Sequence, residues 1–228
     1  MQNRIQPIED SRKTVTALVQ ERVRQAILDG LLSPGSRIDQ NQLAIDLNVS
    51  LVPIREALKT LEGEGFVQII PRRGAFVTEI SLEDMDDLYF TRQIIEGQAA
   101  YHAVEHLTAS NVEQLETLYQ YMDTALLDHD FPGFMDYNRE FHFVIYNASN
   151  SRYLSNLITG LWDLAERYRY RYLLLRDQGE SIQREHRVIL DACHQRDAKA
   201  LRNAIITHMQ HTLKSLRTHF ASEQDGQD

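Results

Sequence analysis

Residues 40–64 read QNQLAIDLNVSLVPIREALKTLEGE. Apolar residues recur at helical spacing on both sides of Asn48–Ser50, so the pattern predicts a short helix at 40–47, a tight turn and a second helix ending near Glu64. Pro53 falls in the first turn of the second helix, where its missing backbone N–H is tolerated. Two short helices joined by such a turn are typical of a helix-turn-helix.

The flanking sequence predicts a winged form of this motif. A helical pattern at 14–29 precedes it. After it, two runs rich in β-forming residues, 66–70 and 75–80, lie on either side of Pro71–Gly74, which predicts a hairpin. We therefore expect residues 1–79 to form a winged helix-turn-helix domain.

From residue 81 the sequence pattern changes to long helices. Six helical segments follow, and they predict a six-helix antiparallel bundle with its own core over residues 80–228. Helix starts are expected at Ser81 and Ser110, each followed three residues later by an acidic side chain, as in a capping box. The chain is therefore expected to be mainly α-helical and to have two domains.

The two predicted domains differ in charge and in histidine content. Residues 1–80 carry no net charge, whereas the rest of the chain carries the whole net charge of −9. All 9 histidines follow residue 100. A negative net charge argues against a protein that coats nucleic acid by bulk attraction.

The composition is that of a globular protein without a membrane partner. It is 43% hydrophobic and 25% charged, and no apolar run approaches the ~20 residues of a membrane span. The N-terminal residues lack the apolar segment of a secretory signal. The single cysteine, Cys193, cannot form an internal disulfide, so a reducing, cytoplasmic location is expected.

The outward positions at the start of the second helix are candidates for DNA contact, because a recognition helix lies in the major groove. They are Ser50, Leu51, Val52, Arg55 and Lys59. Arg55 can reach a guanine edge or a phosphate. Ser50 is expected to cap the helix and also to contact a phosphate.

The tip of the predicted hairpin is the other candidate for DNA contact. Arg72 and Arg73, followed by Gly74, suit a contact with the DNA backbone or the minor groove. A single arginine is more often simply solvated, but this set in this pattern favours DNA contact.

Three histidines fall on the apolar faces of three different predicted bundle helices. They are His142, His186 and His208. Asn138 lies one helical turn before His142, so both side chains can converge on one point. Imidazoles are frequent zinc ligands, and three unpaired polar rings in a core would be costly. The pattern favours a metal site over core histidines that each hydrogen-bond a neighbour.

Two further groups of charged residues are candidates for contact with an effector. Arg92 and Glu96 fall on or beside the apolar stripe of the first bundle helix. Arg92 could hold a carboxylate by two hydrogen bonds, or it could form a buried ion pair with Glu96, and the sequence favours neither. Arg169 and Arg171 alternate with tyrosines and could add effector-binding groups or lie on a solvated helix face.

Several motifs in the N-terminal part resemble the GntR family of bacterial transcriptional regulators. They are LSPG at 32–35, LAxxLxVSxxPIREAL at 43–58, LxxxGFV at 61–67 and RRGxxV at 72–77. The resemblance implies a homodimer that binds a two-fold operator in double-stranded DNA. The family usually has an arginine where this chain has Leu51. Leucine can contact a thymine methyl group but cannot bind guanine through two hydrogen bonds, so a family-typical operator is not implied.

The helical part resembles the FCD class of this family, and its six helices rather than seven resemble the VanR-type branch. Many members have Asp-x-x-x-His on the third bundle helix and one histidine on each of the last two. Asn138, His142, His186 and His208 occupy these positions, which implies a divalent metal, with zinc as first choice and nickel or manganese as alternatives. Asn138 brings no charge, so an incoming carboxylate would restore charge balance.

Together these features predict a transcription regulator of the repressor type, not an enzyme, whose bundle binds a metal ion and a small carboxylate metabolite. One alternative is a metal-dependent hydrolase, although no nucleophile motif is present and Glu96 and Glu185 are the sole candidate bases. Another is a bundle that serves only dimerisation, with histidines that stabilise the fold.

Overall fold

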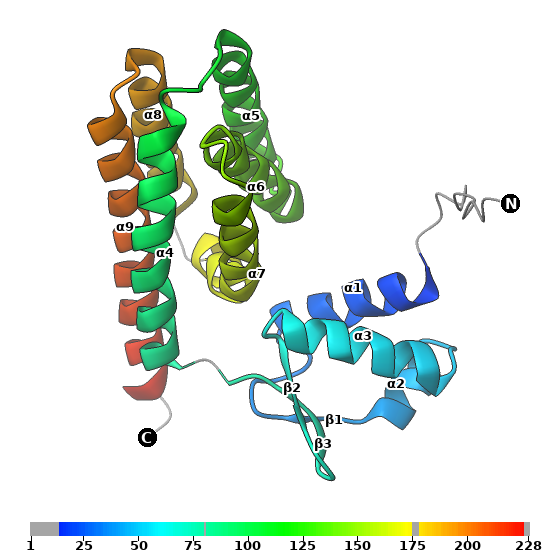
Figure 1. Ribbon diagram of the computed structural model, residues 1–228. Helices are drawn as coiled ribbons and strands as arrows, with labels where there is room; N and C mark the ends of the chain where they lie inside the picture. The colour runs from blue at the N-terminus through cyan, green and yellow to red at the C-terminus, as the bar shows by residue number, and fades with distance from the viewer. Residues whose placement is uncertain (1–13, 80, 175–177, 226–228) are drawn as a thin grey trace, which may run out of the picture. The chain divides into compact units, whose positions relative to one another are not determined.

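The computed structural model describes residues 14–79, 81–174 and 178–225, without the side chains of residues 167, 170, 171, 174, 178 and 221–225. The chain divides into two compact units, Met1–Glu79 and Ile80–Asp228. Figure 1 shows that the first unit combines helices with a small sheet and that the second is helical. The prediction of a mainly α protein with an N-terminal winged helix-turn-helix and a helical second unit is confirmed.

Over residues 14–79, the first unit has three helices and a three-stranded antiparallel sheet with the strand order β1-β3-β2. Its elements are α1 (Val15–Leu28), β1 (Arg37–Ile38), α2 (Gln40–Asp46), α3 (Leu51–Gly63), β2 (Val67–Ile70) and β3 (Gly74–Val77). The helices and the hairpin lie where the sequence predicts them. Strand β1 was not predicted, because a strand of two residues is too short to show an alternating pattern.

Helix α3 is held in the first unit by one fully buried face. Ile54, Ala57, Leu58 and Leu61 are at most 1% exposed, and their spacing places them on one side of the helix. This side packs against α1 and α2. Asn48, in the turn between α2 and α3, has a φ of 52°, a left-handed conformation that asparagine tolerates better than most residues. The opposite side of α3 is left free to contact a partner.

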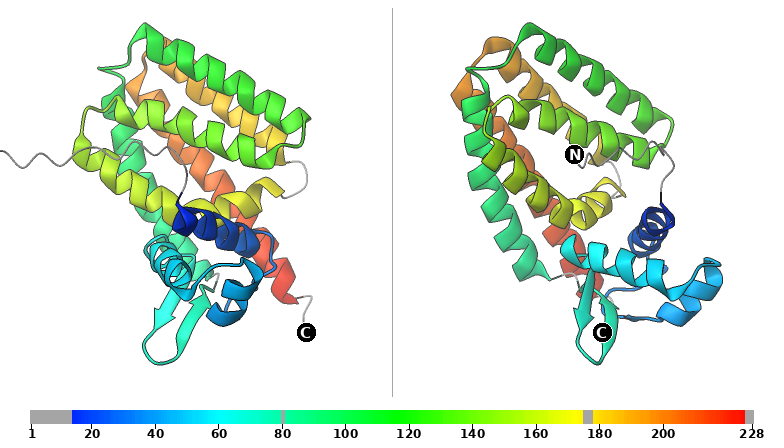
Figure 2. Two further views of the ribbon diagram at one scale, coloured as in Figure 1. Left: turned by 90° about the vertical axis from the view of Figure 1, so that its right-hand side faces the viewer. Right: turned by 45° about the vertical axis from the view of Figure 1, so that its right-hand side comes forward.

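The second unit is a bundle of six helices within the described residues. They are α4 (Leu82–Ala103), α5 (Ala109–Leu127), α6 (Phe131–Asn147), α7 (Arg152–Leu174), α8 (Gln178–Gln195) and α9 (Ala198–Asp225). The first and last of these, α4 and α9, run side by side along the bundle (Figures 1 and 2). Gly97 permits this approach, because a Cβ atom there would lie 3.0 Å from the Ile206 side chain. Helix α5 contacts both α6 and α8, which closes the bundle around one core.

The starts of α4 and α5 are fixed by side-chain caps. Ser81 accepts a hydrogen bond from the Asp84 backbone N–H, as predicted. Helix α5 begins at Thr108, which forms a capping box with Asn111, so the predicted start at Ser110 is wrong. Threonine and asparagine supply the same two reciprocal hydrogen bonds that the predicted serine and glutamate would have supplied.

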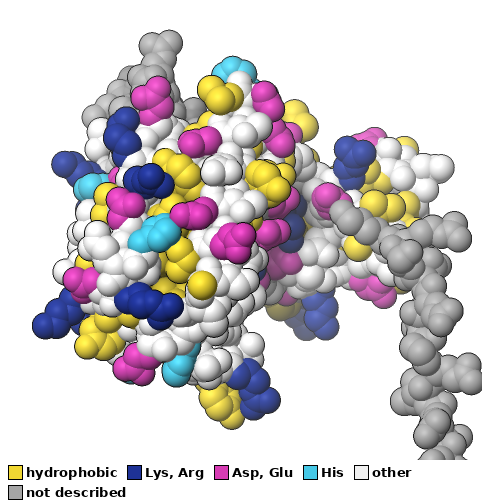
Figure 3. All heavy atoms as spheres, turned by 90° about the horizontal axis from the view of Figure 1, so that it is seen from above, with side chains coloured by type: hydrophobic (Ala, Val, Ile, Leu, Met, Phe, Trp, Pro, Cys, Tyr) yellow, Lys and Arg dark blue, Asp and Glu magenta, His cyan; other side chains and the backbone are white. Residues whose placement is uncertain are grey.

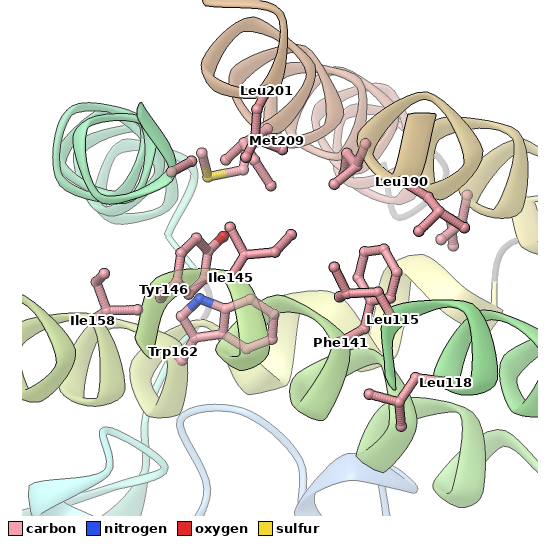
Figure 4. Packing of buried hydrophobic residues seen from close by; sticks show 14 of the residues in the cluster. Leu115, Leu118, Phe141, Ile145, Tyr146, Ile158, Trp162, Leu190, Leu201 and Met209 are labelled. Carbon is pink, nitrogen blue, oxygen red and sulfur yellow. The ribbon is translucent and has the colours of Figure 1, made fainter. Parts of the chain in front are cut away.

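The bundle core contains large aromatic side chains next to buried polar ones. Trp162, Tyr146 and Phe141 are each at most 1% exposed, and Figure 4 shows the indole of Trp162 beside the Tyr146 ring. Arg92, Glu96, Asn138, His142 and His186 are also buried within the bundle. Buried polar groups require partners, so this part of the core is a candidate binding site. Among the described helices, none is long and apolar enough to cross a bilayer.

Candidate functional site

The predicted DNA-contact residues of α3 begin at its N-cap and continue along the helix. Val52 is 62% exposed, Arg55 and Lys59 are exposed, and Leu51 is half-buried. Arg55 Nε lies 3.4 Å from Gln40 Oε1, a weak link to the first residue of α2. Val52 and Arg55 are therefore available to a partner near the N-terminal end of α3, and Lys59 is available farther along the helix.

Ser50 occupies the N-cap position of α3 but makes no capping hydrogen bond. The expectation that its side chain caps the helix is therefore wrong. Pro53 provides the reason, because it stands at the third helical position, where the backbone N–H that a cap binds is normally found. The hydroxyl group of Ser50 is not used within the helix.

The hairpin between β2 and β3 carries a group of arginines at its tip. Arg72 and Arg73 are exposed, and Arg73 lies over the Phe76 ring at 5.7 Å. Gly74 has a φ of 110°, and a Cβ atom there would lie 3.4 Å from Arg37 Nε. Arg37, on β1, thus joins the predicted pair at the wing. Arg37 was not predicted, because its two-residue strand is too short to show an alternating sequence pattern.

Three histidines from separate helices converge inside the bundle. His142 of α6, His186 of α8 and His208 of α9 each offer a ring nitrogen, and these atoms all lie within 4.8 Å of one another. The Nε2 atoms of His142 and His186 are 3.2 Å apart. The structure therefore brings together the three histidines that the sequence selected.

A carboxylate fixes the orientation of the His208 ring. Glu185 Oε2 lies 2.7 Å from His208 Nδ1, and its other oxygen lies 2.7 Å from His211 Nδ1. A carboxylate accepts hydrogen bonds, so Nδ1 of His208 donates and its Nε2 lone pair remains for another ligand. The sequence pointed to Glu185 only as a possible base, whereas in the structure it supports a histidine.

An amide performs the same function for His186. Gln183 Oε1 lies 3.0 Å from His186 Nδ1, while the amide nitrogen of Gln183 donates to Asp123 Oδ1 at 2.7 Å and to the Tyr119 backbone oxygen at 3.2 Å. Because these two acceptors on α5 fix the amide orientation, its oxygen must face His186. His186 therefore donates from Nδ1 and directs its Nε2 lone pair toward His142.

Burial keeps two of the three histidines neutral. His142 is 1% and His186 is 0% exposed. Burial in the core, reinforced by the neighbouring histidines, holds the pKa of His142 and of His186 well below the usual value. Neutral imidazole is the form that binds a metal ion. The ring nitrogens are thus in the required protonation state at neutral pH.

The donor set fits a divalent transition metal. Three imidazoles are a common zinc set, and hydrogen bonds from such ligands to outer groups, as His208 and His186 make to Glu185 and Gln183, are their usual support. Asn138 is 5% exposed and lines the same cavity as His142 and His208. Its amide oxygen adds an uncharged atom that could ligate a metal in that cavity.

Arg92 and Glu96 form the buried ion pair that the sequence left open. Arg92 Nε lies 2.6 Å from Glu96 Oε1. The Tyr146 hydroxyl and the Trp162 indole N–H donate to the other carboxylate oxygen at 2.6 and 2.9 Å. Tyr146 Oη also lies 3.4 Å from His142 Nδ1. This network connects the ion pair to the histidine cluster.

A cavity lies next to the histidine cluster. Its lining includes His142, His208, Arg92, Glu96 and Arg169. The Arg169 guanidinium lies over the Trp162 ring at 4.0 Å and donates to the Trp162 backbone oxygen at 3.0 Å. Two cationic side chains thus face a cavity that the ring nitrogens also reach. The side chain of Arg171, the remaining predicted effector residue, lies outside the described residues.

Comparison with known proteins gives consistent matches over most of the chain. Residues 16–77 match the gntR family of bacterial regulatory proteins, and residues 87–211 match the FCD domain. The HTH-type transcriptional repressor RspR of Escherichia coli (strain K12) is 29% identical over 195 residues, 86% of each chain. The HTH-type transcriptional regulator McbR of the same strain is 27% identical over 206 residues, 89% of this chain and 93% of its own.

Solved structures show the same fold. E. coli McbR/YncC superimposes with a TM-score of 0.75 at 24% identity, covering 92% of this chain and 100% of that chain. A putative GntR transcriptional regulator from Rhodococcus sp. RHA1 superimposes with a TM-score of 0.69 at 21% identity, over 89% of this chain and 97% of its own.

Proposed function

This chain belongs to the gntR family of bacterial regulatory proteins and has an FCD domain, and on that premise we propose that it is a metabolite-responsive repressor of transcription that acts in the bacterial cytoplasm. The family and these relatives are transcriptional regulators, not enzymes. The convergence of three oriented imidazoles beside a cationic cavity is the observation that carries the metabolite response.

The first unit is the part of the protein that binds DNA. Val52 and Arg55 at the exposed start of α3 suit the major groove, and the arginines of the wing suit the phosphate backbone. The face of the bundle seen in Figure 3 does not resemble a DNA-binding face, because acidic and basic side chains are interspersed over it. Residues 1–79 therefore supply the operator contact, and residues 80–228 supply control.

The bundle binds a divalent ion, zinc before nickel or manganese, through His142, His186 and His208. When bound, such an ion supplies open coordination positions for an anionic ligand. Asn138 brings no charge to the site, so the ion retains its full positive charge. A small carboxylate metabolite is the ligand class that this charge favours.

Regulation requires that the metabolite bind two conformations of the protein with different affinities. A repressor released by its metabolite would bind the operator in the metabolite-free state. The described bundle has six helices, which supports placement in the VanR-type branch.

The regulator acts as a homodimer that matches a two-fold operator. Phe90 and Ile94, one helical turn apart on α4, are 62% and 54% exposed. Neighbouring apolar side chains of this size on a surface are typical of a face that a second copy covers.

A DNA-selection experiment tests this function. The full chain, loaded with zinc, would be used to select duplexes from a random library, and the enriched duplex would then be titrated with and without zinc and a pool of small carboxylic acids. Enrichment of an inverted repeat that the acids release supports the proposal. Binding that neither zinc nor any acid changes would indicate a bundle that serves only dimerisation.

A further inference from the structure

We propose that the cavity binds its ligand at two points and that the second point, formed by Tyr89 and Arg169, selects a short dicarboxylate. The inference rests on the proposed function, which assigns one carboxylate to the histidine cluster. It adds a second anionic group and names the residues that recognise it.

Tyr89 offers a buried hydroxyl group whose proton has no acceptor among the described residues. Its side chain is 1% exposed and lines the cavity. No hydrogen-bond partner for its hydroxyl oxygen is found in the described part of the chain. Burial raises the pKa of Tyr89, so the hydroxyl keeps its proton as a donor. A buried donor without an acceptor is unfavourable, and a ligand anion would satisfy it.

Arg169 offers a second unsatisfied donor beside the same cavity. Its Nε is buried and has no hydrogen-bond partner among the described residues. Within the described part of the bundle, its guanidinium makes one hydrogen bond, which goes to the Trp162 backbone oxygen, a neutral group. Burial, together with the nearby Arg92, lowers the pKa of Arg169 to about 10, so it remains a cation at neutral pH.

The charges lining the cavity do not balance. Arg92 is paired with Glu96 through a contact of 2.6 Å. No carboxylate within the described residues forms an ion pair with Arg169, and Glu166 stabilises its charge only from a longer distance, so the guanidinium has no direct counter-ion. Buried charges are stable only when paired, and a second ligand carboxylate would pair this one. A ligand with one carboxylate, bound at the histidines, would leave Arg169 unpaired.

The distances limit the length of the ligand. The Trp162 ring lies close to both points, with its centroid 5.1 Å from that of His142 and 4.0 Å from the Arg169 guanidinium carbon. The His142 ring and the Arg169 guanidinium are therefore at most about 9 Å apart. An acid with two to three carbons between its carboxylates, such as succinate or glutarate, is of a length that suits this limit.

Matched pairs of acids test the second binding point. The full chain loaded with zinc would be titrated by calorimetry with succinate against butyrate and with glutarate against valerate, pairs of equal chain length that differ in one carboxylate. At least one dicarboxylate should bind about tenfold or more tightly than its partner, the effect of one hydrogen bond to a charged group. Tyr89→Phe and Arg169→Gln should each remove about tenfold of that affinity and leave the monocarboxylates unchanged.

Tyr153→Phe is the matched control, because Tyr153 is 72% exposed on the same bundle. Thermal denaturation without ligand provides a second readout, since Tyr89→Phe removes an unsatisfied buried hydroxyl and should not lower the melting temperature. If Arg169→Gln fails to fold, Tyr89→Phe decides the outcome.

Equal affinities within both pairs would overturn the second binding point while leaving the proposed function intact. The same holds for a dicarboxylate preference that survives both substitutions. Failure of all four acids to bind the zinc-loaded chain would overturn the inference and the carboxylate part of the proposed function together.

Discussion

His142 Nε2 and His186 Nε2 lie 3.2 Å apart, although the two residues are separated by 44 positions in the chain. Two nitrogens bound to one tetrahedral zinc ion at 2.0–2.1 Å are about 3.3 Å from each other. The bundle therefore holds these two rings at the separation that a shared ion requires. His186 Nδ1 faces the Gln183 amide oxygen at 3.0 Å, and His142 Nδ1 lies 3.4 Å from the Tyr146 hydroxyl.

We expect the purified protein to contain close to one equivalent of zinc, and the His142→Ala/His186→Ala double variant to contain none. Elemental analysis by mass spectrometry measures this directly. Chelation should also lower the melting temperature of the native protein, because an ion present at 100 times its dissociation constant stabilises the folded state by about 2.7 kcal/mol. His106→Ala, at an exposed position, should retain the metal. Absence of metal from the native protein after incubation with zinc, nickel and manganese would contradict the site.

Glu185→Gln should weaken metal binding without removing a ligand. Glu185 accepts hydrogen bonds from both His208 and His211, and loss of such a supporting carboxylate typically costs roughly 10–100-fold in affinity. Competition with a chromogenic chelator measures the dissociation constant. Glu180→Gln is the control, because the Glu180 side chain is 89% exposed on the same helix. Equal affinity in the two variants would mean that Glu185 does not support the site.

Glu96→Ala should destabilise the protein strongly. Glu96 is the acceptor for Arg92, Tyr146 and Trp162, and removal of one partner from a buried ion pair costs about 3–5 kcal/mol. Urea denaturation measures the free energy of unfolding. Asp163→Ala breaks the half-exposed Arg139–Asp163 pair and should cost about 0–1 kcal/mol. Similar losses in the two variants would show that the Glu96 network does not stabilise the core.

Arg55→Ala should weaken binding to the selected operator and reduce the dependence of that binding on salt. Each lost phosphate contact lowers the salt slope by about 1, whereas a lost guanine contact costs about 1–3 kcal/mol and relaxes the sequence preference at one position. Fluorescence anisotropy at several salt concentrations distinguishes the two cases. Arg184→Ala removes the same charge from the 70% exposed Arg184 of the bundle and should change neither quantity. If Arg55→Ala behaves like that control, α3 is not the recognition helix.

Cys193 should be unreactive in the folded protein. It is 0% exposed, and burial raises the pKa of its thiol to about 12, so the reactive thiolate is scarce at pH 8. A disulfide reagent at pH 8 should modify it slowly in buffer and rapidly, with one equivalent per chain, in urea. Rapid modification in buffer would show that this part of the bundle opens readily.

The features that follow from local periodicity could be predicted from the sequence. The buried stripe of α3 and the inward positions of His142 and His186 depend on helical spacing alone, so the pattern placed them correctly. Ser50 shows the limit of local rules, because the proline three residues later removes the N–H that its side chain would have bound.

The features that depend on distant partners could not be predicted. Gln183 orients His186 because α5 supplies two acceptors about 60 residues away, and no local pattern indicates that contact. The choice between a ligand clamp and an ion pair at Arg92 likewise depended on how the rotamers of Arg92 and Glu96 pack against α6 and α7. Arg37 was missed because its strand has two residues.

The pairing of α4 with α9 has a consequence for the order in which the protein acquires its abilities during synthesis. The elements of the first unit are complete by Val77, so this unit can fold while the ribosome is still translating the bundle. The bundle cannot close until its last helix, which also carries His208, has been made. If the proposed function is correct, a nascent chain would complete its DNA-binding unit before its metabolite-binding unit. An interruption of translation after the first unit would then release a DNA-binding unit without the bundle that is proposed to control it.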